Sequence, residues 1–195
     1  MIETRVLTGA DLDAALDDVA ALRIRVFRDW PYLYDGDVAY ERRYLETYRT
    51  SPGAVLVGAF EGARLVGAAT GTPLAEHADE FAEAFEATDI EISSVFYCAE
   101  SVLLAGYRGR GIGHRFFDLR EAHAKALGFD RSAFCAVIRP ANHPLKPKSY
   151  RPLDGFWQAR GYRPLPGVVA KFGWKDLDAK EETFKPMQFW LKSGL

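Results

Sequence analysis

Cysteine is scarce in this sequence. Only Cys98 and Cys135 occur among 195 residues, and each lies inside an apolar run. Two cysteines cannot build the disulfide framework of a small secreted domain. The four histidines and the cysteines also lack the spacing of a metal-binding motif. We therefore expect two buried free thiols and no metal.

Long apolar runs and an excess of one charge are also missing. No stretch approaches the roughly 18 consecutive apolar residues that suggest a transmembrane helix. The first ten residues are mixed polar, with Glu3 and Arg5, and lack the apolar centre of a secretory signal. The formal net charge is −2, so no overall basic field draws the chain to nucleic acid or anionic lipid. We expect a cytoplasmic protein with neither nucleic acid nor a membrane as partner.

The composition supplies what one hydrophobic core requires. Hydrophobic residues make up 48% of the chain and charged residues 27%, which is ordinary for a globular protein. The length suits one core, and no repeat, low-complexity segment or linker divides the sequence. We therefore expect residues 1–195 to form a single domain.

The spacing of apolar residues, and the turn residues between them, predict strands and helices in a mixed order. One strand–helix–strand unit stands inside an otherwise antiparallel series. We therefore expect an α/β chain of the α+β type, with a mixed, mostly antiparallel central sheet flanked by helices. The expected strands cover residues 2–7, 54–60, 64–72, 92–104, 129–139, 168–174 and 187–192. The expected helices cover residues 12–29, 38–50, 75–87, 113–127 and 153–160.

A glycine-rich loop follows the long expected strand and opens a helix. Its sequence is Arg108-Gly109-Arg110-Gly111-Ile112-Gly113. Glycines let a backbone approach an anion closely, and the first N–H groups of a helix have no intrahelical partner. The loop lacks the Lys-Ser/Thr ending of a P-loop, and it is not the G-x-G-x-x-G of a dinucleotide fold. From these residues alone, an anion-binding loop and a simple tight turn both remain open.

Three segments together resemble one family. The pattern Arg-x-x-Gly-x-Gly in residues 108–113 is similar to the coenzyme A signature of the GCN5-related N-acetyltransferase (GNAT) superfamily. Residues 101–104 resemble the splayed central strand of that family. Residues 156–162, Phe-Trp-Gln-Ala-Arg-Gly-Tyr, resemble its later aromatic block. The order of elements over residues 2–174 is also similar.

This resemblance implies a GNAT-like fold and acetyl-CoA as co-substrate. It implies transfer of an acetyl group to the primary amine of a small molecule or peptide, without a metal. In the family, loop amides hold the cofactor pyrophosphate, and the preceding strand bonds the pantetheine arm. Carried over to this chain, the cofactor-binding residues are Leu103, Leu104, Arg108, Gly109, Arg110, Gly111, Ile112, Gly113 and His114.

Glu100 is the candidate general base. Aminolysis of a thioester needs a free amine, so a group must accept a proton. Strand alternation places Glu100 on the same face as Cys98, Val102 and Leu104, among apolar neighbours. Many members of the family carry a catalytic glutamate on this strand, shortly before the loop. The alternative is an exposed or salt-bridged glutamate.

The proton donor to the leaving thiolate is less well defined. Members of the family often use a tyrosine four residues before the glycine of the last motif. Trp157 stands there in this chain and cannot donate that proton. Tyr150 is the remaining candidate, because Tyr162 matches a packing position, and a reaction without an acid is also open. Cys98 is an outside candidate for an acyl-cysteine route, but direct transfer is favoured.

The acceptor site is expected in the variable segments. Trp30, Tyr32 and Tyr34 could form an apolar or cation-binding wall for an amine, or simply pack. Residues 76–91 are acidic and could overhang the acceptor mouth or form a solvated face. The basic residues 142–151 could contact the adenosine 3′-phosphate or an acidic acceptor, or serve solubility.

Other functions stay open at this stage. The presence of Trp157 allows a non-catalytic module that binds or senses acyl-CoA. A third alternative is an acetyltransferase that modifies proteins or other macromolecules. The C-terminal strands would allow a homodimer.

Overall fold

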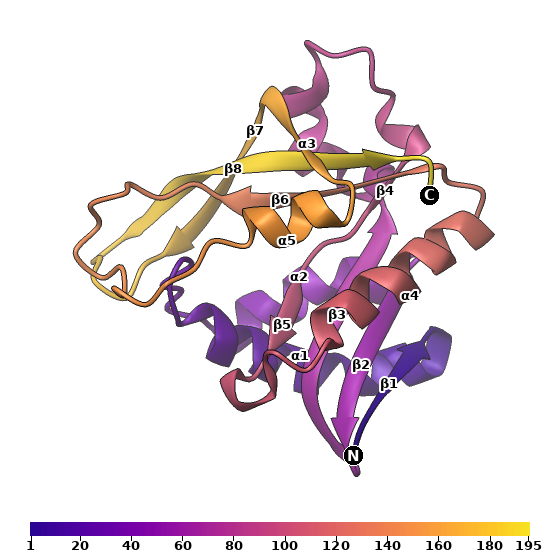
Figure 1. Cartoon of the computed structure of the whole chain (residues 1–195), viewed down its shortest axis with the longest axis horizontal. Helices are drawn as coiled ribbons and strands as arrows, with labels where there is room; N and C mark the ends of the chain where they lie inside the picture. Colours follow the sequence, from indigo (N-terminus) through magenta and orange to yellow (C-terminus); the bar gives the residue numbers. More distant parts are fainter.

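The computed structural model describes residues 1–195 and contains a mixed sheet of eight strands with helices on both faces (Figure 1). The strand order is β1-β2-β3-β4-β6-β8-β7, with β5 paired to β3 outside this path. All pairs are antiparallel except β4 with β6. The strands are β1 (Ile2–Leu7), β2 (Val55–Glu61), β3 (Arg64–Pro73), β4 (Val95–Tyr97), β5 (Ser101–Leu103), β6 (Arg131–Val137), β7 (Arg163–Lys175) and β8 (Glu182–Ser193).

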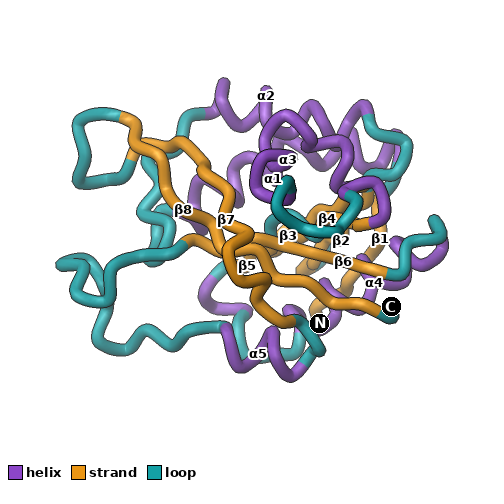
Figure 2. Tube along the Cα trace, turned by 90° about the horizontal axis from the view of Figure 1, so that it is seen from above, coloured by secondary structure: helices purple, strands orange, loops and turns teal.

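The helices form two layers around this sheet. Figure 2 shows α1, α2 and α3 on one side of the strands, with α4 and α5 on the other. No helix combines the length and the apolar character needed to cross a bilayer. The α-helices are α1 (Gly9–Phe27), α2 (Val38–Thr50), α3 (Ala78–Phe85), α4 (Ile112–Ala126) and α5 (Asp154–Ala159), and the 3-10 helices are η1 (Leu74–His77), η2 (Ile92–Ser94) and η3 (Ala105–Tyr107).

The predicted fold class is confirmed, and several predicted boundaries hold. The strand at 2–7 and the helix at 38–50 match β1 and α2. The side chain of Asp37 caps α2 by accepting from the amide of Tyr40 at 2.8 Å. The predicted helix at 75–87 is instead divided into η1 and α3, while β7 and β8 are longer than predicted.

The prediction of one continuous strand at residues 92–104 is wrong, and the difference matters for the site. In the structure this segment is broken between β4 and β5. The amide of Cys98 still donates to Ala133 of β6 at 2.8 Å, whereas the amide of Ala99 donates to Thr70 of β3 at 3.1 Å. From this point β5 pairs with β3 alone, while β6 continues along β8. The two strands therefore separate, and a gap opens between β5 and β6.

Candidate active site

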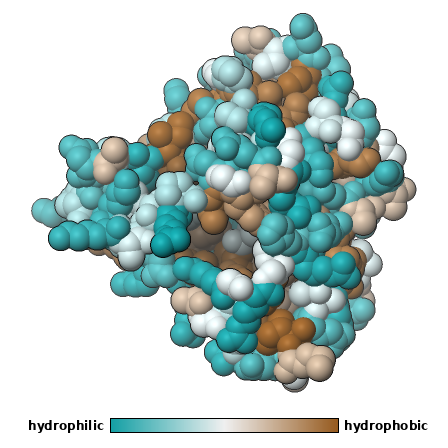
Figure 3. Space-filling view, in the orientation of Figure 1, coloured by the Kyte–Doolittle hydropathy of each residue, from teal (hydrophilic) through white to brown (hydrophobic).

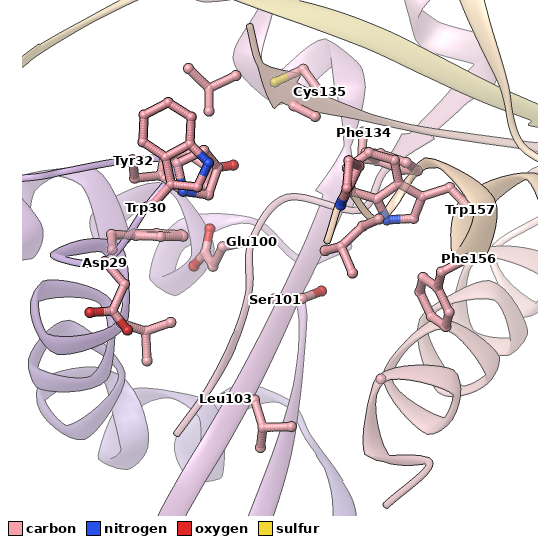
Figure 4. Close-up of a pocket in the computed structure, with 18 of the residues that line it drawn as sticks. Asp29, Trp30, Tyr32, Glu100, Ser101, Leu103, Phe134, Cys135, Phe156 and Trp157 are labelled. Carbon is pink, nitrogen blue, oxygen red and sulfur yellow. The ribbon is translucent and has the colours of Figure 1, made fainter. Parts of the chain in front are cut away.

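A large cavity occupies the gap between β5 and β6. Its volume is about 1370 Å³, and apolar side chains are visible inside its opening (Figure 3). Pockets for one small molecule usually hold about 300–1,000 Å³, so this cavity has room for two reactants. In Figure 4, Phe134, Phe156 and Trp157 line one side, on the α4/α5 face. Trp30 and Tyr32 line the opposite side, and Glu100 lies near them.

The glycine-rich loop forms one end of the cavity. No amide of residues 109–114 donates a hydrogen bond within the protein. Gly109 and Gly111 have φ of 75° and 77°, the left-handed region that favours glycine. Gly111 is also the N-cap of α4, which has 15 residues. Consecutive free amides at the positive end of a helix fit the anionic pyrophosphate that the resemblance of the loop implies.

The main chain of β5 forms the floor of the cavity. The amide of Leu104 donates to Val66 of β3 at 3.1 Å, and its carbonyl accepts from the amide of Tyr107 at 2.9 Å. Because the hydrogen-bonding direction alternates along a strand, the main-chain groups of Ser101 and Leu103 point away from β3. Both residues line the cavity, whereas Leu104 does not. The carbonyl of Leu103 accepts from Arg108 Nε at 3.3 Å. The main chain of Ser101 and the amide of Leu103, rather than Leu104, therefore offer groups to a ligand in the gap.

Glu100 is buried, with 6% of its surface exposed, and it lines the cavity. Its Oε2 atom accepts from Arg23 Nη1 at 2.8 Å and from the Tyr44 hydroxyl at 3.2 Å. Its Oε1 atom is buried and has no partner. The predicted apolar surroundings are thus only partly present, because residues 98–100 leave the strand and alternation no longer holds there. Glu100 is both salt-bridged and directed to the cavity.

Arg23 connects Glu100 to a second buried carboxylate, Glu41. Burial alone would lower the pKa of Arg23, but the charges of Glu100, Tyr44 and Glu41 raise it well above its usual value. The arginine is therefore permanently charged. One oxygen of Glu100 is held in place by this fixed cation, and the other oxygen has no partner.

The aromatic loop between α1 and α2 forms the far wall. Trp30 and Tyr32 are half-buried and line the cavity, while Tyr34 is 8% exposed and packs mainly in the core. The side chain of Arg139 donates to the carbonyls of Pro31 and Tyr32 and so holds the loop in place. The indole N–H of Trp174 adds a hydrogen bond of 3.0 Å to the same Tyr32 carbonyl.

Comparison with known proteins agrees with this geometry. The sequence model of the acetyltransferase (GNAT) family matches residues 19–147, which include the aromatic loop, Glu100 and the glycine-rich loop. The chain belongs to the GNAT acetyltransferase family. It is therefore an acetyltransferase, with acetyl-CoA as its acyl donor. No protein of curated function matches it significantly.

Solved structures of GNAT proteins share the fold. The chain is similar to a ribosomal-protein-alanine N-acetyltransferase from Brucella melitensis, with 14% identity, a TM-score of 0.60, and 98% and 99% of the two chains covered. The yncA protein of Salmonella typhimurium, solved with its cofactor acetyl-CoA, has 11% identity and a TM-score of 0.58, and the match covers 98% of this chain and 93% of that one. A GCN5-related N-acetyltransferase from Kribbella flavida has 14% identity and a TM-score of 0.58, and the match covers 98% of this chain and 97% of that one.

Trp157, at the position where the family often has its acid, and Tyr150, the remaining candidate, have different surroundings in this GNAT protein. Trp157 packs against Phe134 and Trp190, with ring centroids 4.9 and 5.2 Å apart. Tyr150 is half-buried, lines the cavity and contacts Trp30 edge-on at 6.0 Å. Burial, with a smaller contribution from the charge of Asp154, raises the pKa of Tyr150. Its hydroxyl therefore keeps its proton at neutral pH.

The charged segments predicted around the acceptor site separate in the structure. Phe81 and Phe85 of α3 are buried, and none of the acidic residues of 76–91 lines the cavity, so the overhanging acidic mouth is not found. In the basic segment, Lys146 and Arg151 do line the cavity. No group of three or more His, Cys, Asp or Glu side chains is placed to hold a metal ion.

Both cysteines line the cavity but are buried as free thiols. Burial raises the pKa of Cys98, and it raises that of Cys135 to about 12. A thiol that keeps its proton is a poor nucleophile. Acyl transfer through Cys98 is therefore disfavoured.

We expect no acetyl-enzyme to form when the protein is incubated with acetyl-CoA alone. Intact-mass spectrometry should show one unmodified species, and Cys98→Ala should retain most of kcat with an amine acceptor. An acetyl adduct on the wild type that is absent from Cys98→Ala would contradict direct transfer.

Arg139 and Asp176 are site-supporting residues that sequence reasoning missed. Arg139 Nη1 and Nη2 bind the carboxylate of Asp176 at 2.7 and 2.9 Å, and Lys185 lies 3.3 Å from the same carboxylate. The partners are 37 residues apart, so no local pattern marks them. This pair joins the chain just after β6 to the β7–β8 hairpin and, through Arg139, to the aromatic loop.

Replacing Arg139 by Met is expected to destabilise the fold by about 2 kcal/mol, because Asp176 and two loop carbonyls lose the hydrogen bonds from the guanidinium group. Urea unfolding measures the loss, and Arg42→Met is the control, since Arg42 forms only an exposed pair with Asp17. The interpretation is wrong if both variants lose the same stability.

The pH dependence of this loss has a defined sign. Burial by itself would raise the pKa of Asp176, but Arg139 and Lys185 outweigh it and hold the pKa below its usual value. The pair therefore stabilises the fold above the ordinary pKa of an aspartate and is lost as pH falls through the lowered value. We expect the stability difference between wild type and Arg139→Met to shrink in acid.

Proposed function

We propose that the chain transfers the acetyl group of acetyl-CoA directly to the primary amine of a small molecule or peptide, with Glu100 as the general base. One observation carries the proposal: Glu100, whose Oε1 atom is buried and has no partner, lines a cavity that has the free loop amides at one end and an aromatic wall at the other. A donor and an acceptor entering from these two ends meet beside a carboxylate.

Different residues bind the donor and accept the proton. The amides of residues 109–114 bind the pyrophosphate, and the main chain of Ser101 and Leu103 orients the pantetheine arm. As the amine nitrogen bonds to the thioester carbonyl carbon, Glu100 accepts a proton from it, directly or through one water. The C–S bond then breaks, and the coenzyme leaves as a thiol or thiolate.

Positioning and protonation are assigned to neighbouring groups. Arg23 and Tyr44 hold Oε2 of Glu100 and so fix the direction of the free Oε1 atom. Tyr150, whose hydroxyl keeps its proton, is the proposed donor to the leaving sulfur. Because a coenzyme A thiolate is a tolerable leaving group, we expect Tyr150→Phe to cost less activity than loss of Glu100.

A panel of amines tests the proposal. The panel contains alkylamines, arylalkylamines, polyamines, amino acids and short peptides, and the readouts are release of free coenzyme A thiol and the mass of the acetylated product. We expect at least one small amine or peptide to be acetylated with stoichiometric thiol release.

The alternative function is a non-catalytic module that binds acyl-CoA. Trp157 favours it, because this residue replaces the usual acid of the family with a side chain packed between Phe134 and Trp190. Calorimetric binding of acetyl-CoA without turnover of any amine would support this alternative and contradict the proposed catalysis.

A further inference from the structure

We propose that the acceptor is a single-charged amine with an aromatic or similarly flat apolar body, such as an arylalkylamine. This inference rests on the proposed function and specifies its acceptor. It follows from the walls, the charges and the unpartnered polar atoms of the acceptor half of the cavity.

The walls of the acceptor half are mainly aromatic. Trp30 and Tyr32 contribute from the α1–α2 loop, and Phe172 and Trp174 contribute from β7. The rings of Tyr32 and Trp174 lie 5.8 Å apart, and the Tyr32 main chain is held by hydrogen bonds from Trp174 and Arg139. A wall fixed in this way favours a flat apolar ligand, because little order has to be created when it binds.

The buried arginines near the acceptor half already bind carboxylates or carbonyls of the protein. Arg23 binds Glu100 and Glu41, and Arg139 binds Asp176. Arg120 donates to main-chain carbonyls, including that of Glu100, and to the Ser101 hydroxyl on the α4 side. The other cations that line the cavity, Arg108, Lys146 and Arg151, are exposed. A buried acceptor carboxylate would therefore find no free arginine or lysine.

One unpartnered polar atom of the lining residues favours an ammonium group, namely the carboxylate oxygen Oε1 of Glu100. The other two are the indole N–H of Trp30, which can only donate, and the hydroxyl of Tyr34, which can also accept. Figure 4 shows Glu100 on the same side of the cavity as Trp30 and Tyr32. An amine held there meets the carboxylate with its charged end and the rings with its body, and cation–π attraction adds to both.

The matched pair of phenethylamine and phenylalanine isolates the charge requirement, because the two differ only by a carboxylate. We expect kcat/KM for phenethylamine to exceed that for phenylalanine by at least about a hundredfold, since a buried carboxylate without a partner is costly. We expect it to exceed that for butylamine by at least about tenfold, because the aliphatic chain buries less apolar surface. Spermidine should be a poor acceptor, since its further charges have no buried partner.

Trp30→Ala tests the wall itself. We expect KM for phenethylamine to rise about tenfold, with the Kd of acetyl-CoA unchanged. Phe184→Ala is the control, because Phe184 is 74% exposed and does not line the cavity, so neither constant should change. Trp30→Leu provides a second variant if Trp30→Ala does not fold.

The outcomes separate this inference from the proposed function. Equal or better turnover of phenylalanine, spermidine or butylamine would overturn the acceptor class while leaving acetyl transfer intact. An unchanged KM in Trp30→Ala would likewise remove Trp30 from the acceptor wall. No turnover of any amine by protein that binds acetyl-CoA would overturn the proposed function and this inference with it.

Discussion

Gly111→Glu is expected to weaken acetyl-CoA binding at least about a hundredfold. Gly111 lies among the free amides of residues 109–114, and no protein atom outside its chain neighbours lies within 4 Å of a Cβ built there. A glutamate would therefore extend into the space of the ligand and bring a negative charge to the pyrophosphate. Losing two charge-assisted hydrogen bonds costs about 3 kcal/mol, which corresponds to the hundredfold effect.

The control for this prediction separates charge from backbone strain. Gly111 has a φ of 77°, which most side chains avoid, so any substitution strains the loop. Asparagine tolerates this region better and carries no charge. In isothermal titration calorimetry, Gly111→Asn should bind acetyl-CoA much more tightly than Gly111→Glu. Wild-type affinity in Gly111→Glu would show that the pyrophosphate binds elsewhere.

Glu100→Gln is expected to lower kcat about a hundred- to ten-thousandfold, the usual contribution of a general base. Glutamine keeps the shape of the side chain but cannot accept the proton. The Kd of acetyl-CoA should stay unchanged, since the loop amides do not contact Glu100. Rapid measurement of thiol release under saturating amine gives kcat.

Glu41→Gln is the matched control, because Arg23 binds both carboxylates but Glu41 does not line the cavity. Each substitution weakens one pair of the same buried arginine, and each is expected to destabilise the fold by a similar amount. Only Glu100→Gln should abolish most of the activity. Equal losses of kcat in the two variants would mean that Glu100 acts through the stability of the cluster.

The fold and one half of the site could be predicted because their signals are local. The spacing of apolar residues locates most helices and strands, and the glycines with the following helix mark the loop of residues 108–113. The free amides of that loop follow from helix geometry, which does not depend on distant residues. Glu100 is a candidate because it lies shortly before this loop, and its catalytic role stays a prediction.

The rest depends on contacts between distant residues. The break at residues 98–100 results from competition between β3 and β6 for the same main chain, which no window of sequence contains. In the sequence, Arg23 is an ordinary polar residue of a predicted helix, and only the fold brings it into contact with Glu100. The contacts of Trp30 with His143 and Tyr150 bring the basic segment to the aromatic loop, more than 100 positions away. Contacts between residues so far apart in the sequence can be identified only from the folded structure.

A crystal structure of the complex with acetyl-CoA would test the central claim most directly, namely that acetyl-CoA binds in the gap between β5 and β6. The account predicts pyrophosphate oxygens within hydrogen-bond distance of the amides of residues 109–114. It also predicts the pantetheine beside Ser101 and Leu103, and the thioester next to Oε1 of Glu100. A coenzyme whose pyrophosphate lies instead on Lys146 and Arg151, with its thioester away from Glu100, would contradict the account.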